Sequence, residues 1–176
     1  MYGTRMLRTH QTQGSFGGTH ACTSIAAHAA RGLGRYVGSG SVPTTSTLNR
    51  WMSHGSKAWK EWCAASSIDP TTQASFQTST DVTMPWVKVT SERNGCSLAT
   101  LDTVVAGEPC CVTIDGRTFA LVRTEAGHVF LFDSHPSIFG RGASIFRFRS
   151  MARCIAHLQL THSNDSEVYV WTLEAT

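Results

Sequence analysis

VTIDGRTFALVRTEAGHVFLFDSH, the stretch from Val112 to His135, decides how this chain folds. Its β-branched and aromatic residues fall into short apolar runs, which the pairs Asp115-Gly116 and Ala126-Gly127 separate. An Asp-Gly pair between two such runs is a strong signal for a tight hairpin turn. We therefore predict an antiparallel meander of consecutive strands. Its members are Cys110–Ile114, Thr118–Thr124 and His128–Asp133.

The sequence after the meander also carries regular patterns. Ser144–Arg149 has the character of a further strand, and Glu167–Leu173 alternates polar and apolar residues like a strand that closes a sheet. Between them, Met151–Leu160 has the apolar spacing of a short amphipathic helix. The C-terminal half is therefore predicted to be rich in β-structure.

The sequence before the meander is predicted to be mainly helical. From Thr23 to Arg35 it is rich in alanine, and we expect a buried central helix that begins at or near Cys22. The other predicted segments are a second amphipathic helix over 47–65, a polar loop over 66–83, a short strand or turn over 86–89 and a short helix over 98–105. The pattern predicts a single α+β domain over residues 1–176, with the Cys-bearing helix packed on a C-terminal antiparallel sheet.

Composition narrows the classes of partner. Hydrophobic residues make up 41% of the chain and charged residues 15%, which is typical of a globular protein and not of a disordered one. The formal net charge of +3 includes no Lys/Arg run, so we expect no nucleic-acid partner. No stretch reaches the roughly 18 consecutive apolar residues of a spanning helix, and the first residues lack the apolar core of a signal peptide. We therefore expect an intracellular monomer without a membrane partner, either cytoplasmic or delivered into a host cytosol.

The six cysteines give no sign of a metal site. They are scattered, and no Cys-x-x-Cys pair meets a second pair at zinc spacing. Most of them are expected to be reduced thiols in packing positions. We expect neither a metal nor a cofactor, so the chemistry must come from side chains.

One cysteine differs from the others in its setting. Cys22 follows a Gly-rich loop and precedes the predicted central helix. The unpaired backbone N–H groups and the positive dipole end of a helix start favour an anion, and a thiolate is an anion. A thiol placed there beside a histidine is a reactive nucleophile at neutral pH. Cys22 is therefore the candidate nucleophile, and a buried inert thiol is the alternative interpretation.

His135 is the candidate base among the eight histidines. It follows an apolar strand and stands two positions after Asp133. Because residues i and i+2 of an extended chain point the same way, the carboxylate can lie beside the imidazole and fix its tautomer, as in a catalytic triad. The alternative is a chance β-turn, Asp-Ser-His-Pro. Histidines in helical or loop segments are interpreted as surface residues: His54, His157 and His162.

An acyl-transfer site also needs an oxyanion hole. Each preorganised donor to the tetrahedral intermediate is worth roughly 3–4 kcal/mol. The backbone N–H of Cys22 is one candidate donor. A second often comes from an amide side chain upstream of the nucleophile, and Gln11 and Gln13 are both within reach. The pattern does not choose between them, and an exposed loop position is the alternative for either.

These residues, in this order, resemble a known family. The Gln-bearing loop, the Gly-rich turn into Cys22, the helix and the late hairpin that ends in Phe-Asp-x-His are similar to the peptidase domain of the herpesvirus large tegument protein and its tegument-like deubiquitinase relatives. The resemblance implies a papain-like fold and cleavage after the C-terminal glycine of ubiquitin. It also implies a triad of Cys22, His135 and Asp133, with Gln11 as the oxyanion glutamine.

Ubiquitin or polyubiquitin is the partner that the resemblance implies. We expect Gly18 on one side and Thr118 and Phe119 on the other to line a channel for the Gly-Gly tail. Candidates for docking the body of ubiquitin, with core packing as the alternative for at least two of them, are Trp51, Trp59 and Trp86. Two rival functions are another papain-like cysteine hydrolase or acyltransferase, such as a cell-wall amidase or a host-directed effector, and a catalytically silent ubiquitin-binding module.

Overall fold

The computed structural model describes residues 3–17, 20–70, 88–136 and 142–174. Its centre is a seven-stranded sheet with the strand order β1-β6-β5-β4-β3-β7-β2, and neighbouring strands are antiparallel. The strands are β1 (Thr4–Arg8), β2 (Val89–Gly95), β3 (Cys110–Ile114), β4 (Arg117–Arg123), β5 (Val129–Asp133), β6 (Ser144–Phe148) and β7 (Val168–Leu173). The helices are α1 (Cys22–Ser39), α2 (Thr45–Ala65) and α3 (Met151–Leu158), with short 3₁₀ turns η1 (Gln13–Phe16) and η3 (Leu98–Thr103).

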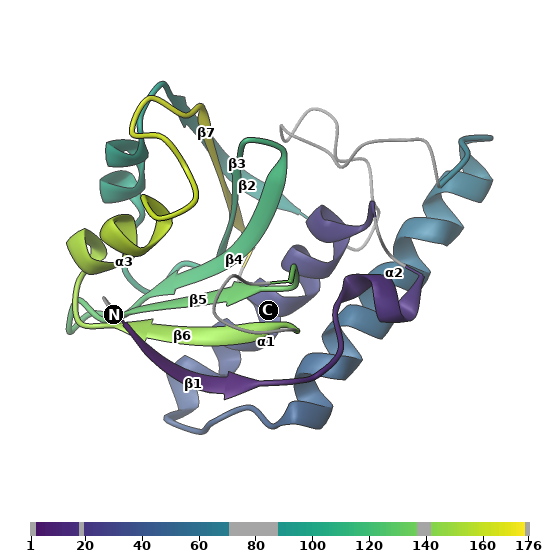
Figure 1. Cartoon of the computed structure of the whole chain (residues 1–176), viewed down its shortest axis with the longest axis horizontal. Helices are drawn as coiled ribbons and strands as arrows, with labels where there is room; N and C mark the ends of the chain where they lie inside the picture. Colours follow the sequence, from purple (N-terminus) through teal and green to yellow (C-terminus); the bar gives the residue numbers. More distant parts are fainter. Residues whose placement is uncertain (1–2, 18–19, 71–87, 137–141, 175–176) are drawn as a thin grey trace.

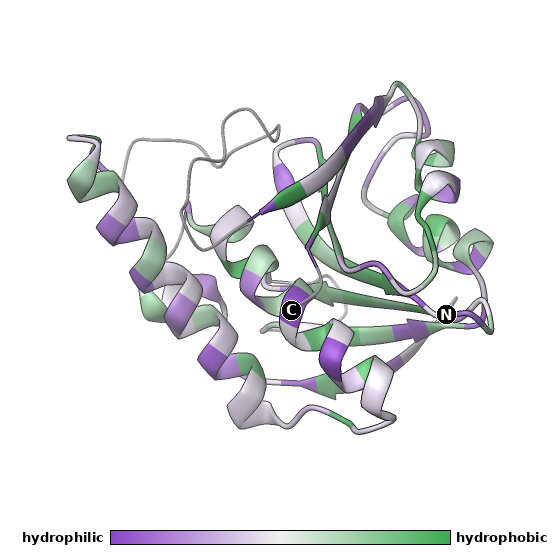
Figure 2. Cartoon of the chain, turned by 180° about the vertical axis from the view of Figure 1, so that it is seen from behind, coloured by the Kyte–Doolittle hydropathy of each residue, from purple (hydrophilic) through white to green (hydrophobic). Residues whose placement is uncertain are grey.

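Helices lie against both faces of the sheet (Figure 1). On one face α1 packs on β4 and its neighbours β3 and β5, and α2 packs on α1 (Figure 2). On the other face α3 and η3 cover a second core. Successive residues of a strand enter different cores, as Cys111 and Val112 do. Because both faces are covered, the central strands β3 and β4 are buried at nearly every position and mostly apolar.

The predicted meander is present as β3, β4 and β5. Asp115 and Gly116 connect the first two strands with φ angles of 49° and 76°. A type I′ turn requires positive φ at both central residues, so the local sequence and the turn agree. The predicted strand and helix segments downstream are present as β6, α3 and β7. The predicted helix start at Cys22 is confirmed as well.

The two edge strands differ from the predictions. β1 was not predicted, and it pairs with β6. β2 pairs with β7 over Val89–Gly95, whereas a strand or turn was predicted over 86–89, of which 86 and 87 lie outside the described residues. Both edges are rich in polar and charged residues, which protect exposed strand edges from aggregation and weaken the apolar pattern. The predicted loop before the nucleophile contains the short turn η1.

Two tryptophans that were candidates for docking a partner belong to the core. Trp51 is 8% exposed and Trp59 is 1% exposed, and both pack in the cluster under α1 and α2. Core packing, which was expected for at least two of the three tryptophans, is therefore confirmed for these two, and their side chains do not form a docking surface. Trp86 lies outside the described residues. No helix in the described part of the chain is long and apolar enough to cross a membrane.

The contact between α1 and α2 depends on a glycine. A Cβ atom at Gly55 would lie 2.5 Å from the Cα of Ile25, and the Gly55 carbonyl accepts a hydrogen bond of 2.7 Å from the Ser24 hydroxyl. The atom closest to this Cβ belongs to the backbone of α1, which cannot move aside as the end of a flexible side chain could.

We expect Gly55→Ala to destabilise the protein by about 1–3 kcal/mol, because the new methyl group overpacks a helix contact. The matched control is Gly38→Ala, since a Cβ there meets nothing within 4 Å. In a helix this control should stabilise by about 0.5 kcal/mol, the usual direction for glycine to alanine. Chemical denaturation of the two variants measures both effects. Equal effects of the two substitutions would contradict the packing assigned to Gly55.

Candidate active site

Cys22 is the first residue of α1 and is only 3% exposed. The start of α1 packs closely against the sheet, and the hydroxyl of Thr23 lies 2.9 Å from the hydroxyl of Thr118 on β4. The Ala-rich sequence permits this close approach, because alanine side chains are small. The fold thus holds the thiol at the positive end of a helix dipole, against the central strands.

Asp133 and His135 lie side by side at the end of β5. The carboxylate Oδ1 of Asp133 accepts two hydrogen bonds of 2.8 Å, one from the backbone N–H and one from the ring Nδ1 of His135. These bonds fix the ring orientation and direct Nε2 away from the carboxylate. The predicted placement of the two residues is therefore present.

The imidazole of His135 also meets the thiol of Cys22. Burial opposes the charged form of His135, which is 8% exposed. Hydrogen bonds to Asp133 and to the Cys22 thiol, with the charges of both groups, outweigh burial and raise the pKa of His135 to about 9. Cys22 from α1, His135 and Asp133 thus form one contiguous set. An imidazolium beside a thiol favours the thiolate, as a nucleophile requires.

We expect an NMR titration of the His135 ring to show a midpoint near pH 9, whereas His28, whose pKa is lowered mainly by burial, titrates below 6.5. Because the pKa of His135 is raised on folding, its contribution to stability is fully present below about pH 6.5 and is lost as pH rises through about 9. Asp133→Asn should lower the midpoint. A wild-type midpoint at or below 6.5 would show that the ion pair is absent.

The structure distinguishes the two candidate oxyanion glutamines. Gln11 is exposed, whereas Gln13 is 7% exposed. The Gln13 backbone N–H donates to the carbonyl of Ser134, and the Ser134 hydroxyl donates to Gln13 Oε1 over 2.9 Å. Ser134 is the residue between Asp133 and His135, so Gln13 is tied directly to the triad segment. The spacing in the sequence could not show this, because the contact joins residues far apart in the chain.

Of the three residues predicted to line a substrate channel, Phe119 lies beside the triad. Its ring centroid is 5.9 Å from that of His135, but the side chain is 3% exposed and packs in the core that α3 and η3 cover. The Thr118 side chain is 1% exposed and bonds the hydroxyls of Thr23 and Thr113, so only its backbone could contact a substrate. Gly18 lies outside the described residues.

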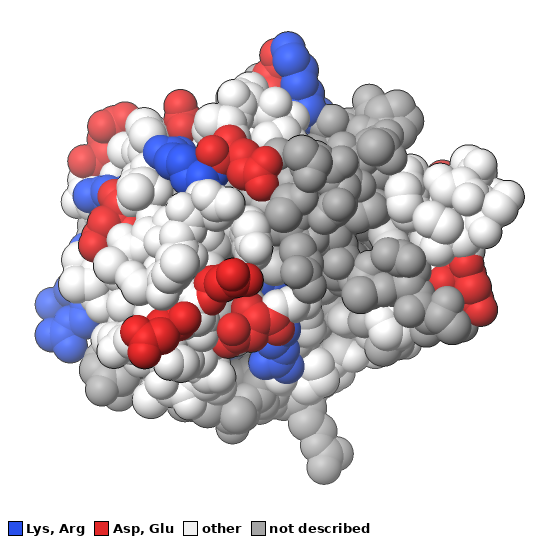
Figure 3. Space-filling model, turned by 90° about the horizontal axis from the view of Figure 1, so that it is seen from above, with Lys and Arg blue, Asp and Glu red and all other residues white. Residues whose placement is uncertain are grey.

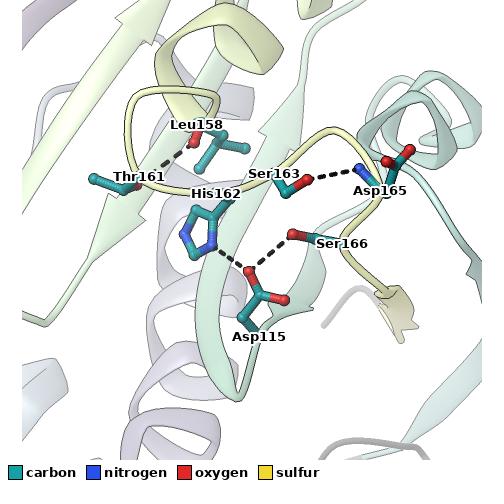
Figure 4. A network of polar contacts seen from close by, with 7 residues as sticks. All are labelled: Asp115, Leu158, Thr161, His162, Ser163, Asp165 and Ser166. Atoms are coloured by element: carbon teal, nitrogen blue, oxygen red, sulfur yellow. Dashed lines mark hydrogen bonds and ion pairs between the residues drawn. The ribbon is translucent and has the colours of Figure 1, made fainter.

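His162 is not a surface residue, and that prediction is wrong. Its side chain is 3% exposed, and its Nδ1 lies 3.0 Å from Asp115 Oδ2, which also accepts a hydrogen bond from Ser166 (Figure 4). The bond from His162 is the main reason that the pKa of Asp115 is lowered. The ring of His162 packs edge-on against the ring of Phe119, with 6.0 Å between the ring centroids. This second Asp–His pair ties the hairpin turn to the loop after α3.

Acidic residues gather near the same hairpin turn. Asp115, Asp165 and Glu167 line a small polar pocket of about 320 Å³. Seen from above, several acidic side chains lie close together on this side of the molecule (Figure 3). Within the described residues, no group of three or more His, Cys, Asp or Glu side chains is placed to hold a metal ion.

The other cysteines lack the setting of Cys22. Burial raises the pKa of the Cys110 thiol to about 12 and that of the Cys111 and Cys154 thiols well above the ordinary value. Cys63 lies on the buried face of α2, and Cys96 is exposed. All six cysteines are free thiols, so Cys22 is distinguished by its contact with His135.

Comparison with known proteins identifies the fold. No model of a known family matches the sequence, and no curated protein matches it. The structure is similar to that of a ubiquitin-specific protease encoded by murine cytomegalovirus tegument protein M48, in complex with a ubiquitin-based suicide substrate. The TM-score is 0.68, and the match covers 95% of this chain and 84% of that chain at 14% identity. The predicted papain-like α+β fold is thereby confirmed.

Proposed function

We propose that this protein is a deubiquitinase that hydrolyses the bond after the C-terminal glycine of ubiquitin with a Cys22, His135 and Asp133 triad. The observation that carries the proposal is the buried imidazole of His135, bonded to Asp133 on one side and to the Cys22 thiol on the other. The shared fold with a ubiquitin-specific protease supports the choice of substrate.

In the first step the Cys22 thiolate attacks the carbonyl carbon of the terminal glycine. The C–S bond forms, and the carbonyl oxygen becomes an oxyanion. The His135 imidazolium then donates its proton to the leaving amine of the conjugated lysine as the C–N bond breaks. The products of this step are a free amine and a thioester on Cys22.

Water completes the cycle. His135, now neutral, takes a proton from a water molecule that attacks the thioester carbonyl. The C–S bond breaks, ubiquitin leaves as a carboxylic acid that loses its proton to solvent, and the thiolate and imidazolium are restored. Asp133 holds the ring throughout and stabilises its charged form, because Nδ1 stays bonded to the carboxylate.

The backbone N–H of Cys22 and one glutamine amide are the proposed oxyanion donors. We now place Gln13 before Gln11, because Gln13 is buried against Ser134 of the triad segment. Phe119 packs beside His135 and is buried in the core, so we propose that it helps to orient the imidazole ring and that its side chain does not line a channel for the glycines. The protein would act in a cytosol that contains ubiquitin conjugates, either that of the cell that makes the protein or that of a host cell.

The test is hydrolysis of ubiquitin with a C-terminal fluorogenic amide and of a panel of differently linked diubiquitins. We expect release of the fluorophore and of monoubiquitin. A folded protein that binds ubiquitin without cleaving either substrate would instead favour a silent binding module. Cleavage of an unrelated amide together with no effect on ubiquitin would favour another cysteine hydrolase.

A further inference from the structure

A basic groove runs between α1 and α2, along the part of α1 beyond its Cys22 end. It has a volume of about 510 Å³. Five of its lining residues carry basic side chains: His28, Arg31, Arg35, Arg50 and His54. Among the described residues that line it there is no Asp or Glu. Basic side chains therefore gather at this groove, although the sequence has no Lys/Arg run.

Helical spacing gathers these residues on facing sides of the two helices. His28, Arg31 and Arg35 follow one another at three and four positions along α1, which places them on one face. Arg50 and His54 are four positions apart on α2. The two sets meet across the groove, where the rings of His28 and His54 are 6.4 Å apart.

The floor of the groove is rigid and aromatic. A Cβ atom at Gly32 would lie 2.5 Å from Nε1 of Trp51, so this glycine allows the indole to lie directly on α1. Trp51 also packs edge-on against Tyr36, whose hydroxyl lies 3.4 Å from that of Thr47 on the opposite helix. The basic side chains are thus mounted on two helices that are fixed to each other.

Basic side chains from both helices lie close together in the groove. The pKa of His28 is lowered mainly by burial, and the nearby charges of His54 and Arg31 lower it further. Arg35 and Arg50 are exposed, so their guanidinium groups can reach a ligand from solvent. The charges of His54 and Arg31 thus oppose protonation of His28, and an anion bound across the groove would relieve this repulsion.

We propose that this groove binds a small ligand with clustered phosphate groups. Three guanidinium groups suit such a ligand, because each can bind phosphate oxygens through two parallel hydrogen bonds. The volume lies within the roughly 300–1,000 Å³ of small-molecule sites, which favours a small polyanion over a macromolecule. The proposal is independent of the peptidase proposal, because none of the groove residues belongs to the triad.

The test is calorimetric titration of the full chain with inorganic tripolyphosphate at about 0.15 M salt. We expect saturable binding with one site, and a rise in Tm that follows occupancy. Arg35→Gln with Arg50→Gln should weaken binding by about tenfold or more, because two guanidinium contacts are lost. The matched control is Arg153→Gln, an exposed arginine on α3, which should leave the affinity within about twofold. Tm without ligand shows whether each variant is folded, and each single variant should give an intermediate loss.

Three results would overturn the proposal: absence of saturable binding at this salt concentration, equal loss in the Arg153→Gln control, and equally tight binding of citrate, which carries carboxylates in place of phosphates. Two further titrations, one with ATP and one with lipid vesicles, distinguish a free polyphosphate from a lipid headgroup as the natural ligand. Tighter binding of ATP than of vesicles with phosphatidylinositol 4,5-bisphosphate indicates a free polyphosphate, and the reverse indicates a lipid headgroup. In both titrations, Arg35→Gln with Arg50→Gln must weaken the binding.

Discussion

Cys22→Ala is expected to reduce kcat for ubiquitin amide hydrolysis by on the order of 10⁴-fold or more, because no other group can form the acyl-enzyme. The effect should fall on kcat and leave binding of ubiquitin close to that of the wild type. Cys22 is buried at the start of α1, and the smaller alanine keeps the helix intact. Steady-state kinetics with the fluorogenic substrate measure kcat, and calorimetry with ubiquitin measures the binding affinity.

The control for this prediction is Cys96→Ala, since Cys96 is the exposed thiol and lies away from α1 on the loop after β2. Its activity should stay within about twofold of the wild type, because surface substitutions away from special features have small effects. Equal residual activity in the two variants would mean that hydrolysis does not use Cys22.

Asp133→Asn is expected to lower kcat by on the order of 10⁴-fold, the loss seen when the carboxylate of a triad is replaced by an amide. Asparagine can still accept the backbone N–H of His135, so the segment should keep its shape. It cannot stabilise the imidazolium, and its amide can favour the wrong tautomer. We therefore expect the loss in kcat together with a lower pKa of His135, measured by kinetics and NMR on one sample.

The chain contains a matched comparison for that variant. Asp115 also holds a histidine through Nδ1, but its partner is His162 in the loop after α3. Asp115→Asn should reduce thermal stability and leave kcat within about tenfold of the wild type, because the thiol is not involved. If both variants lost activity to the same degree, the special role assigned to Asp133 would be untenable.

The central meander could be predicted from the sequence because its signals are local. The Asp115-Gly116 turn and the apolar runs on either side act within a few residues, and burial of both sheet faces strengthens the pattern. The edge strand β1 gave no such signal. It pairs with a neighbour on one side only and none of its residues is fully buried, and its sequence, TRMLR, is short and largely polar.

The candidate site could be predicted in part for the same reason. Asp133 and His135 are two residues apart, and Cys22 marks the change from loop to helix. The hydrogen bond between Gln13 and Ser134 joins residues that are 121 positions apart. The bond between His162 and Asp115 joins residues that are 47 positions apart. Contacts of that separation leave no periodic trace in a single sequence. The basic groove was missed because the sequence does not show which faces of two helices meet.

The most direct test of the central claim is reaction with ubiquitin that carries an electrophile at its C-terminus, followed by mass spectrometry of the digested adduct. The account predicts one equivalent of ubiquitin attached to Cys22, with labelling lost in Cys22→Ala and retained in Cys96→Ala. A folded sample that stays unlabelled, or an adduct on any other cysteine, would contradict it.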